Sequence, residues 1–371
     1  MKILYIANVR MPTERAYGLQ IVKTCEALAE QGAEIELVIP SRRNSIRDDL
    51  FSYYGIKRNF DVTTLPVPDL VRFGPLGFLL SAVWFSEKVR WLRSFWTADA
   101  VYSRDALVLF QYLLLGRPLV FEAHAPPTLV SRIVACRARR VLVISESLRS
   151  AYVAAGVPSD RVAVAPDAVD EHLFDSAPSR AEARTALGLP SDENIVLYAG
   201  HLYARKGADT LAKAAAAVPG ALFVFVGGTP DDVKNFKRVW GVSPNIRIVG
   251  QVKHELIPAY LRAADLLVLP NSGKDEDSAR YTSPMKLFEY MASGTPIIAS
   301  DVPAVHEILD TSMAVFVAPD NSIALGAGIE RELRMPENGI SRARRALAVI
   351  HNYTWRTRAS VIANSLRTFV S

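Results

Sequence analysis

The sequence has little that would mark a secreted, membrane-spanning or zinc-binding protein. Only two of its 371 residues are cysteines, Cys25 and Cys136, too few for a disulfide framework and without metal-ligand spacing. Its longest apolar stretch, residues 76–85, falls well short of the roughly 20 residues that a membrane span needs. The short apolar start, residues 1–7, leads straight into polar sequence and is expected to be a strand, not a signal peptide. We expect a globular protein of a reducing compartment.

Two nucleotide-binding motifs are also missing. The sequence contains neither the G-x-G-x-x-G turn of dinucleotide-binding units nor a P-loop, which disfavours redox cofactors and nucleotide hydrolysis. The net charge is only +5, and most of the excess lies before residue 171. This mild basic bias suits an anionic membrane surface or a phosphorylated partner, and no nucleic-acid partner is expected.

Short apolar runs alternate with helical-period stretches, the pattern of α/β units around parallel sheets. A helix is expected over 19–31. The first set of strands is expected at 2–7, 35–39, 100–102, 119–122, 140–144 and 162–165. The second set is expected at 195–199, 222–226, 246–249, 266–269, 297–299 and 314–317. Residues 166–190 show no strand period and form the expected linker, with a domain boundary near residue 175.

Ligands of such sheets bind at the carboxyl ends of the strands, so the loops there carry the candidate sites. The segment 283–296 is the most informative. Ser283 is a favoured N-cap, Pro284 a favoured first helical residue and Gly294 a natural stop, which predicts a helix over 284–292. The amides near Met285 and Lys286, at the positive end of this helix, would bind a phosphate.

Glu289 lies one turn further along the same expected helix, about 6 Å along its axis from Met285. A carboxylate there could accept hydrogen bonds from the hydroxyls of a ribose attached to the bound phosphate. The alternative is a solvent-facing glutamate on an ordinary capped helix.

The loop 200–207 leaves the first strand of the second half and carries Arg205, Lys206 and Gly207. Its two cations could neutralise a diphosphate leaving group, a task that magnesium often performs. A Lys-Gly pair is also common before helices for structural reasons. The acids at 275–277 lack nearby histidine or cysteine and are expected to face solvent, so no metal site is expected.

Two further candidates lie in the first half. His124 follows an expected strand and could contact a sugar hydroxyl or the transferred group, although lone histidines at strand ends are often structural. Glu122 is out of phase with that face and is expected to be structural. Gly18 follows the first strand and would let a phosphate or sugar approach the backbone.

Residues 76–96 combine leucines, phenylalanines and three tryptophans with Lys88, Arg90 and Arg93. Arginines cluster again at 132–140. Such a mixture could rest on an anionic membrane surface, or it could form a buried helix with a basic flank.

Taken together, these motifs resemble the retaining glycosyltransferases of family 4. The resemblance covers nearly the whole chain and rests on the following segments: the Gly18 loop, Glu-Ala-His124, residues 143–147 and 164–170, the Arg205-Lys-Gly loop and residues 283–294. It implies an α/β chain with the GT-B fold, in which two Rossmann-like domains have parallel sheets facing a central cleft. Residues 1–175 would bind the acceptor, 176–352 the nucleotide sugar, and a helix over 353–371 would cross back to the first domain.

The resemblance implies a role for each candidate residue. His124, Lys206 and Glu289 would be catalytic, with His124 close to the reacting carbon of the donor sugar. The donor would be held by Gly18, Arg205, Lys206, Ser283, Met285, Lys286 and Glu289. Three positions depart from the family pattern: Tyr281 stands where a glutamate is usual, His201 where many members have arginine, and Ala168 where glycine is usual.

The implied activity is that of a metal-independent, retaining hexosyltransferase with no bound cofactor. Its donor would be a UDP- or GDP-sugar, and its acceptor a glycan or lipid-linked molecule of surface polysaccharide or glycolipid synthesis. Such an enzyme would be cytoplasmic or peripheral on the inner face of the cell membrane. Two alternatives remain open, a non-catalytic nucleotide-sugar-binding protein and a nucleotide-sugar epimerase.

Overall fold

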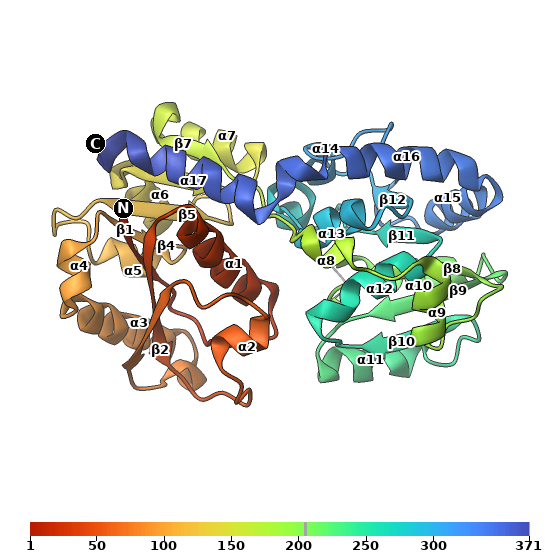
Figure 1. The fold of residues 1–371 in the computed structure, drawn as a ribbon, viewed down its shortest axis with the longest axis horizontal. Helices are drawn as coiled ribbons and strands as arrows, with labels where there is room; N and C mark the ends of the chain where they lie inside the picture. Colours follow the sequence, from red (N-terminus) through yellow and green to blue (C-terminus); the bar gives the residue numbers. More distant parts are fainter. Residues whose placement is uncertain (204–205, 371) are drawn as a thin grey trace. The chain divides into compact units, whose positions relative to one another are not determined.

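The computed structural model describes residues 1–203 and 206–370 and divides the chain into two compact units (Figure 1). Met1–Asp167 and the chain from Trp355 onward form the first unit, and Ala168–Thr354 form the second. The first unit therefore ends at Asp167, before the boundary expected near residue 175.

The chain changes units at this point because the segment after Asp167 is fastened to the end of the second unit. The Val169 amide donates to the Tyr353 carbonyl at 2.9 Å, and Val169 pairs with Thr354 in a parallel bridge. Phe174 is buried in the core of the second unit. The expected linker 166–190 also contains two helices, α8 (His172–Asp175) and α9 (Arg180–Ala186).

The first unit is built on seven parallel strands in the order β3-β2-β1-β4-β5-β6-β7. Its strands are β1 (Lys2–Ile6), β2 (Glu34–Ser41), β3 (Asp61–Pro66), β4 (Ala100–Ser103), β5 (Leu119–Ala123), β6 (Arg140–Val143) and β7 (Val162–Val164). Its helices are α1 (Ala16–Glu30), α2 (Leu50–Tyr54), α3 (Gly74–Arg90), α4 (Arg93–Thr97), α5 (Ala106–Phe110), α6 (Leu129–Arg137), α7 (Glu146–Ala154) and α17 (Trp355–Val370).

Strand β3 is absent from the sequence-based expectation. It lies at the edge of the sheet, and none of its residues is buried. Its pairing depends on β2, where Thr63 Oγ1 also donates to Glu36 Oε1 at 2.6 Å. An edge strand of this kind needs no buried apolar run, so it leaves little hydrophobic pattern in the sequence.

The second unit contains a six-stranded parallel sheet in the order β10-β9-β8-β11-β12-β13. Its strands are β8 (Asn194–Ala199), β9 (Ala221–Val226), β10 (Ile246–Gly250), β11 (Leu266–Leu269), β12 (Ile297–Ser300) and β13 (Val315–Val317). Its helices after α9 are α10 (Ala208–Ala215), α11 (Pro230–Trp240), α12 (Ile257–Ala263), α13 (Met285–Ser293), α14 (Pro303–His306), α15 (Ser322–Arg334) and α16 (Pro336–Ala348).

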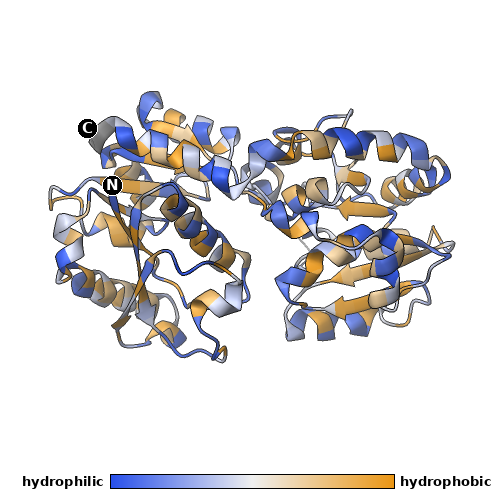
Figure 2. Ribbon diagram, viewed as in Figure 1, coloured by the Kyte–Doolittle hydropathy of each residue, from blue (hydrophilic) through white to orange (hydrophobic). Residues whose placement is uncertain are grey.

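The central strands of both sheets are apolar on both faces, as Figure 2 shows by their colour. In β9 every residue is buried. Leu222, Val224 and Val226 belong to one core cluster, whereas Phe223 and Phe225 belong to another. Helices therefore cover both faces of the sheet, the arrangement that parallel sheets require. Within the residues that the structure describes, no helix is both long and apolar enough to cross a bilayer.

Helix α17 docks on the first unit through a buried ion pair. Arg358 Nη2 donates to Glu122 Oε1 at 2.5 Å, and both side chains are almost completely buried. Arg358 also donates to the carbonyl groups of Ala165 and Pro166, which follow β7. The C-terminal helix is thus bonded to the end of β5 and to the segment that leaves the unit.

Arg358→Met should destabilise the protein by about 3–5 kcal/mol, because removing one partner leaves the Glu122 carboxylate buried without its main counter-charge. Burial by itself raises the pKa of Glu122, but the charge of Arg358 and the hydrogen bond from His124 hold that pKa well below its usual range. The stability contributed by this group is therefore present above about pH 4.3 and is lost as the pH falls through the folded-state pKa.

Urea unfolding of the variant at several pH values checks this expectation, with Arg356→Met, an exposed position on the same helix, as the control. The difference in the free energy of unfolding between wild type and Arg358→Met should become smaller below pH 4, because a protonated Glu122 no longer needs a cation. A gap of less than 1 kcal/mol at pH 7, or one that does not change with pH, would contradict a stabilising role for the pair.

Candidate functional site

In the second unit, the loops after β8 and β11 meet the start of α13. Gly207, at the end of the β8 loop, has φ +77°, and a Cβ there would lie 1.6 Å from the Pro270 carbonyl oxygen. Only glycine allows this contact, so the β8 loop packs directly on the segment that follows β11. Lys206 immediately precedes this glycine, and its amide donates to the Tyr203 carbonyl at 2.9 Å.

The start of α13 differs in one detail from the sequence-based expectation. The helix begins at Met285, and its N-cap is Pro284 without a side-chain cap, so the expectation that Ser283 caps the helix is wrong. Ser283 is instead buried just before the cap. Gly294 ends the helix with φ +68°, as expected. The first amides of a helix lack intrahelical acceptors, so those of Met285 and Lys286 remain suited to an anion.

Two side chains of α13 bring the helix onto the β8 loop. The Tyr290 hydroxyl accepts from the Ala199 amide at 2.8 Å, which bonds α13 to the end of β8. Lys286 places its ammonium 4.2 Å from the centre of the Tyr198 ring. The Lys286 Nζ atom is also 3.6 Å from the position that a Cβ on Gly200 would take.

The Lys286 ammonium is buried and has no hydrogen-bond partner among the described residues. Burial lowers its pKa well below the usual range, and the charge of Lys206 lowers it further, while Glu289 acts in the opposite direction. Two lysines thus repel one another at the carboxyl edge of the sheet, beside the positive end of α13. An anion bound there would relieve this repulsion.

Glu289 is bonded to a residue that the sequence analysis did not identify. Its Oε1 atom lies 2.8 Å from His254 Nε2, in the segment after β10. The Glu289 side chain is 12% exposed, so it is not the solvent-facing glutamate of the alternative interpretation. Its carboxylate is therefore oriented from outside α13, and it lies near enough to Lys286 to influence that ammonium.

Asn271 is a second residue that the sequence analysis missed. It follows β11, is completely buried, and neither atom of its side-chain amide is hydrogen-bonded to a described residue. A buried amide without partners costs free energy, which a bound hydroxyl or phosphate oxygen would recover. Nothing in the local sequence distinguishes this asparagine from an ordinary loop residue.

Two of the three departures from the family pattern, His201 and Ala168, have local explanations. The His201 ring stacks on Tyr203 with centroids 4.9 Å apart, and Nδ1 lies 3.7 Å from Asp232 Oδ2. Ala168 is buried without a left-handed backbone, since Asp320 is the one non-glycine residue with positive φ in the described ranges. Tyr281 ends a π-helical segment, Asp277–Tyr281, before α13, and nothing in the structure explains the tyrosine at this position. Arg205 lies outside the described residues.

In the first unit, His124 belongs to a buried polar network centred on Glu122. Gln20 Nε2 donates to Glu122 Oε1 at 2.7 Å, and Tyr102 and Arg358 donate to the same carboxylate. His124 Nε2 lies 2.6 Å from Glu122 Oε1. Glu122 is structural as expected, and it also positions the histidine.

Electrostatics set the protonation of His124. Burial and the charge of Arg104 lower its pKa, and Glu122 only partly opposes them, so the ring is neutral at pH 7. Because Glu122 is ionised, His124 Nε2 must carry the proton and donate it. Nδ1 is then left as a hydrogen-bond acceptor. Asp167 is close enough to contribute to the same field, and burial raises its pKa.

Gly18 and Asp275, two other positions considered from the sequence, each make contacts within the protein. Gly18 lies inside α1, and a Cβ there would come 2.1 Å from the Tyr54 hydroxyl and 2.5 Å from Thr13. Internal packing therefore accounts for this glycine, and its contact with a ligand stays a prediction. Asp275 caps a turn by accepting from the Ser278 amide at 2.7 Å.

The structure thus brings Lys206, Ser283, Met285, Lys286 and Glu289 together at one edge of the second sheet. It places His124 and Gly18 in the first unit. The second-unit cluster carries the chemistry of a phosphate-binding site, and the first-unit cluster presents a neutral, oriented imidazole.

Models of two glycosyltransferase families match the chain, one in each half. Residues 19–173 match the model described as Glycosyltransferase Family 4, and residues 193–334 match the model described as Glycosyl transferases group 1. Among curated relatives, the D-inositol 3-phosphate glycosyltransferases of Mycobacterium bovis and Mycobacterium tuberculosis are 28% identical over 233 residues. This match covers 60% of the present chain and 46% of theirs, so it spans about half the length of those relatives.

Solved structures resemble almost the whole chain. Sucrose-phosphate synthase from Thermosynechococcus elongatus has a TM-score of 0.80 at 20% identity, covering 99% of this chain and 98% of that one. HepE from Anabaena, in complex with UDP-glucose, has a TM-score of 0.76 at 20% identity, covering 99% and 100%. An E. coli structure bound with UDP-2-fluoro glucose has a TM-score of 0.73 at 14% identity, covering 99% of each chain. These similarities establish the GT-B fold with its two Rossmann-like domains.

Lys286→Met should leave the unliganded protein as stable as wild type or more stable. Methionine keeps the apolar stem and removes a buried charge, and each unit of pKa depression corresponds to about 1.4 kcal/mol. The same variant should lose most of the stabilisation that pyrophosphate gives to wild type. Thermal unfolding with and without pyrophosphate checks both expectations.

Lys213→Met, an exposed lysine on α10 in the same unit, is the matched control and should behave as wild type. If Lys286→Met were clearly less stable without ligand and kept its full response to pyrophosphate, Lys286 would be a structural lysine and not part of an anion site.

Proposed function

Because this chain belongs to the family 4 glycosyltransferases, we propose that it transfers a hexose from a UDP- or GDP-sugar with retention of anomeric configuration. The observation that carries this proposal is the pair of lysines, Lys206 and Lys286, beside the start of α13. A nucleoside diphosphate is the anion whose charge, length and attached ribose suit this cluster. UDP is the first nucleotide to test, since HepE was solved in complex with UDP-glucose.

In the proposed complex the distal phosphate lies at the amides of Met285 and Lys286, and the two ammonium groups contact the diphosphate. Glu289, held by His254, accepts hydrogen bonds from the ribose hydroxyls. Asn271, whose buried amide lacks a described partner, is a candidate for an additional polar contact. Arg205 remains a proposed diphosphate contact on the basis of the family resemblance.

The proposed chemistry needs no nucleophile from the protein. The acceptor hydroxyl attacks the anomeric carbon from the face that the diphosphate leaves, and a phosphate oxygen takes the hydroxyl proton. The glycosidic bond forms as the bond to the diphosphate breaks. Lys206 and Lys286 stabilise the charge that develops on the leaving group, which is the role a metal ion would otherwise play. We therefore propose that the reaction is independent of added metal.

His124 is proposed to contact the transferred sugar. The neutral ring offers Nδ1 as an acceptor for a sugar hydroxyl while Nε2 stays bonded to Glu122. The proposed acceptor is a glycan or a lipid-linked molecule, which places the enzyme in surface polysaccharide or glycolipid synthesis.

Helix α3 supports an acceptor at a membrane surface. Its exposed apolar residues follow a helical spacing along one side: Leu76, Leu79, Leu80, Val83 and Trp84. The other side packs into the unit through Ala82, Phe85 and Val89, so the helix is not the buried one of the alternative interpretation. Cations flank the exposed stripe at Arg72, Lys88, Arg90 and Arg93. We propose that this stripe binds an anionic membrane surface.

Two substitutions test the donor site separately from the chemistry. Glu289→Gln and Lys206→Ala should each weaken UDP-glucose binding by about tenfold or more, because each removes a charge-assisted hydrogen bond to the donor. His124→Ala should lower kcat more than it changes donor affinity. Calorimetry and the release of UDP measured in the presence of EDTA check these expectations.

Lys213→Ala serves as the control for the donor experiments. Unchanged affinity in a folded Glu289→Gln or Lys206→Ala protein would remove that residue from the site. Equal losses of affinity and kcat in His124→Ala would mean a structural role. Tight donor binding without turnover would favour the second candidate, a nucleotide-sugar-binding protein, for which Tyr281 at the usual glutamate position is the supporting observation.

Replacing Leu80 and Trp84 by glutamate should abolish flotation of the protein with vesicles that contain phosphatidylglycerol, since both side chains leave the apolar stripe. Leu114→Glu, at a position that is 93% exposed elsewhere in the same unit, should float as wild type does. If wild type does not bind such vesicles, or if light scattering shows that the stripe joins two copies of the chain, the membrane proposal fails.

A further inference from the structure

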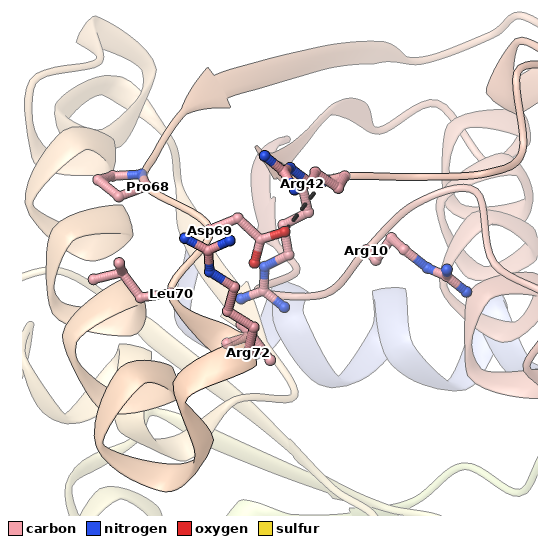
Figure 3. Close-up of a pocket in the computed structure, with 8 residues that line it drawn as sticks. Arg10, Arg42, Pro68, Asp69, Leu70 and Arg72 are labelled. Carbon is pink, nitrogen blue, oxygen red and sulfur yellow. Dashed lines mark hydrogen bonds between the residues drawn. The ribbon is translucent and has the colours of Figure 1, made fainter.

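A pocket of about 630 Å³ in the first unit is lined by four arginines, none of which the sequence analysis identified. Arg10 follows β1, Arg42 and Arg43 follow β2, and Arg72 lies in the segment after β3. These strands are neighbours in the sheet, so the arginines gather at its carboxyl edge. Figure 3 shows Asp69 and Arg72 on one segment, with Arg42 on a second loop and Arg10 on a third, where its side chain points away from Asp69.

Few carboxylates neutralise the positive charge of these arginines. Arg10 pairs with Glu14 at 2.5 Å, but no described Asp or Glu forms an ion pair with Arg42, Arg43 or Arg72. Burial lowers the pKa of Arg42, although the charges of Asp69 and Asp105 oppose this effect. The pocket therefore holds a surplus of positive charge that its own carboxylates do not neutralise.

One of these guanidinium groups is held in place before any ligand arrives. Arg42 Nη2 donates to Asn8 Oδ1 at 2.6 Å, and Asn8 Nδ2 donates to Asp105 Oδ2 at 3.1 Å. This chain of bonds joins the ends of β2, β1 and β4. Arg72 is stacked on the Phe73 ring at 4.7 Å, which limits its freedom as well. Guanidinium groups fixed in this way bind a phosphate with less loss of side-chain entropy.

Asp69 adds a hydrogen-bond acceptor to the pocket. Its Oδ2 atom accepts from the Arg43 amide at 3.2 Å, and no described residue donates to Oδ1. A carboxylate among arginines accepts hydrogen bonds from hydroxyl groups and repels a bare polyanion. The pocket volume lies within the range of sites for small molecules, about 300–1,000 Å³.

We propose that this pocket binds the acceptor through a phosphate group, so that the acceptor is a phosphorylated sugar or polyol. Arg42, Arg43 and Arg72 bind the phosphate, and Asp69 binds the hydroxyls. That the bound phosphate belongs to the acceptor rests on the proposed function. The donor is assigned there to the second unit, which leaves this first-unit pocket for the other substrate. The phosphate is carried either by a lipid headgroup, which agrees with the lipid-linked acceptor proposed above, or by a soluble sugar phosphate, which would replace that acceptor. Arg72 lies two residues before the exposed helix α3, on the side where a lipid would be met.

Calorimetric titration of the full chain with glucose 6-phosphate, and with glucose for comparison, tests the pocket. Glucose 6-phosphate should bind at least about tenfold more tightly than glucose, given the strength of charge-assisted hydrogen bonds. Arg43→Gln and Arg72→Gln should remove most of this preference. Arg356→Gln, an exposed arginine on α17 of the same unit, should retain it, and so should Lys206→Ala, which alters the donor site instead.

A second titration with dihexanoyl phosphatidylinositol, and dihexanoyl phosphatidylcholine as its comparison, identifies the source of the phosphate. Tighter binding of the inositol lipid than of glucose 6-phosphate, lost in Arg72→Gln, indicates a lipid headgroup. The reverse order indicates a soluble sugar phosphate. Either result supports phosphate binding in this pocket.

Three results would overturn the proposal: no preference for either phosphate over its comparison compound, a preference that survives both arginine substitutions, or one that disappears only in Lys206→Ala. The last would place the phosphate in the donor site. If the protein did not turn over UDP-glucose but kept its arginine-dependent phosphate binding, the proposed function would be wrong. The proposal that this pocket binds a phosphate would still hold.

Discussion

In each unit the strands of the sheet run parallel, and this constraint determines where chemistry can occur. Loops that follow parallel strands leave from one edge, so residues far apart in the sequence meet there. In the second unit this edge gathers Lys206, Asn271 and the start of α13. In the first it gathers His124 and the arginines after β1, β2 and β3. The rest of each sheet is a buried scaffold whose apolar strands hold these loops in position.

The two units treat buried charge in opposite ways. Glu122 is fully buried, but it accepts hydrogen bonds from Gln20, Tyr102, His124 and Arg358, so its charge is satisfied within the protein. The Lys286 ammonium is buried beside another lysine and has no such hydrogen bonds among the described residues. The first arrangement fixes an imidazole and docks a helix. The second costs stability unless an anion is bound, which is the physical basis of the proposed donor site.

The sequence alone predicted most of the strands, the α13 segment and the family, because buried parallel strands and helix ends leave strong local patterns. It did not predict β3, whose exposed edge position needs no apolar run. It also missed His254, which meets Glu289 from a separate segment, and the pocket arginines, which meet only once β1, β2 and β3 are paired. Ser283 looked like an N-cap by residue type, yet the helix begins one residue later, after Pro284. Such contacts depend on tertiary structure and not on local preference.

The proposed donor site is tested most directly by calorimetric titration of the full chain with UDP and GDP, with EDTA present, in buffers of different ionisation enthalpy. We expect one of these nucleotides to bind without added metal. We also expect the protein to take up protons on binding when the pH lies above the depressed pKa of Lys286, because the diphosphate restores the charge of that lysine. Absence of binding by either nucleotide, or binding without proton uptake at any pH up to 9, would contradict the role given to the lysine pair.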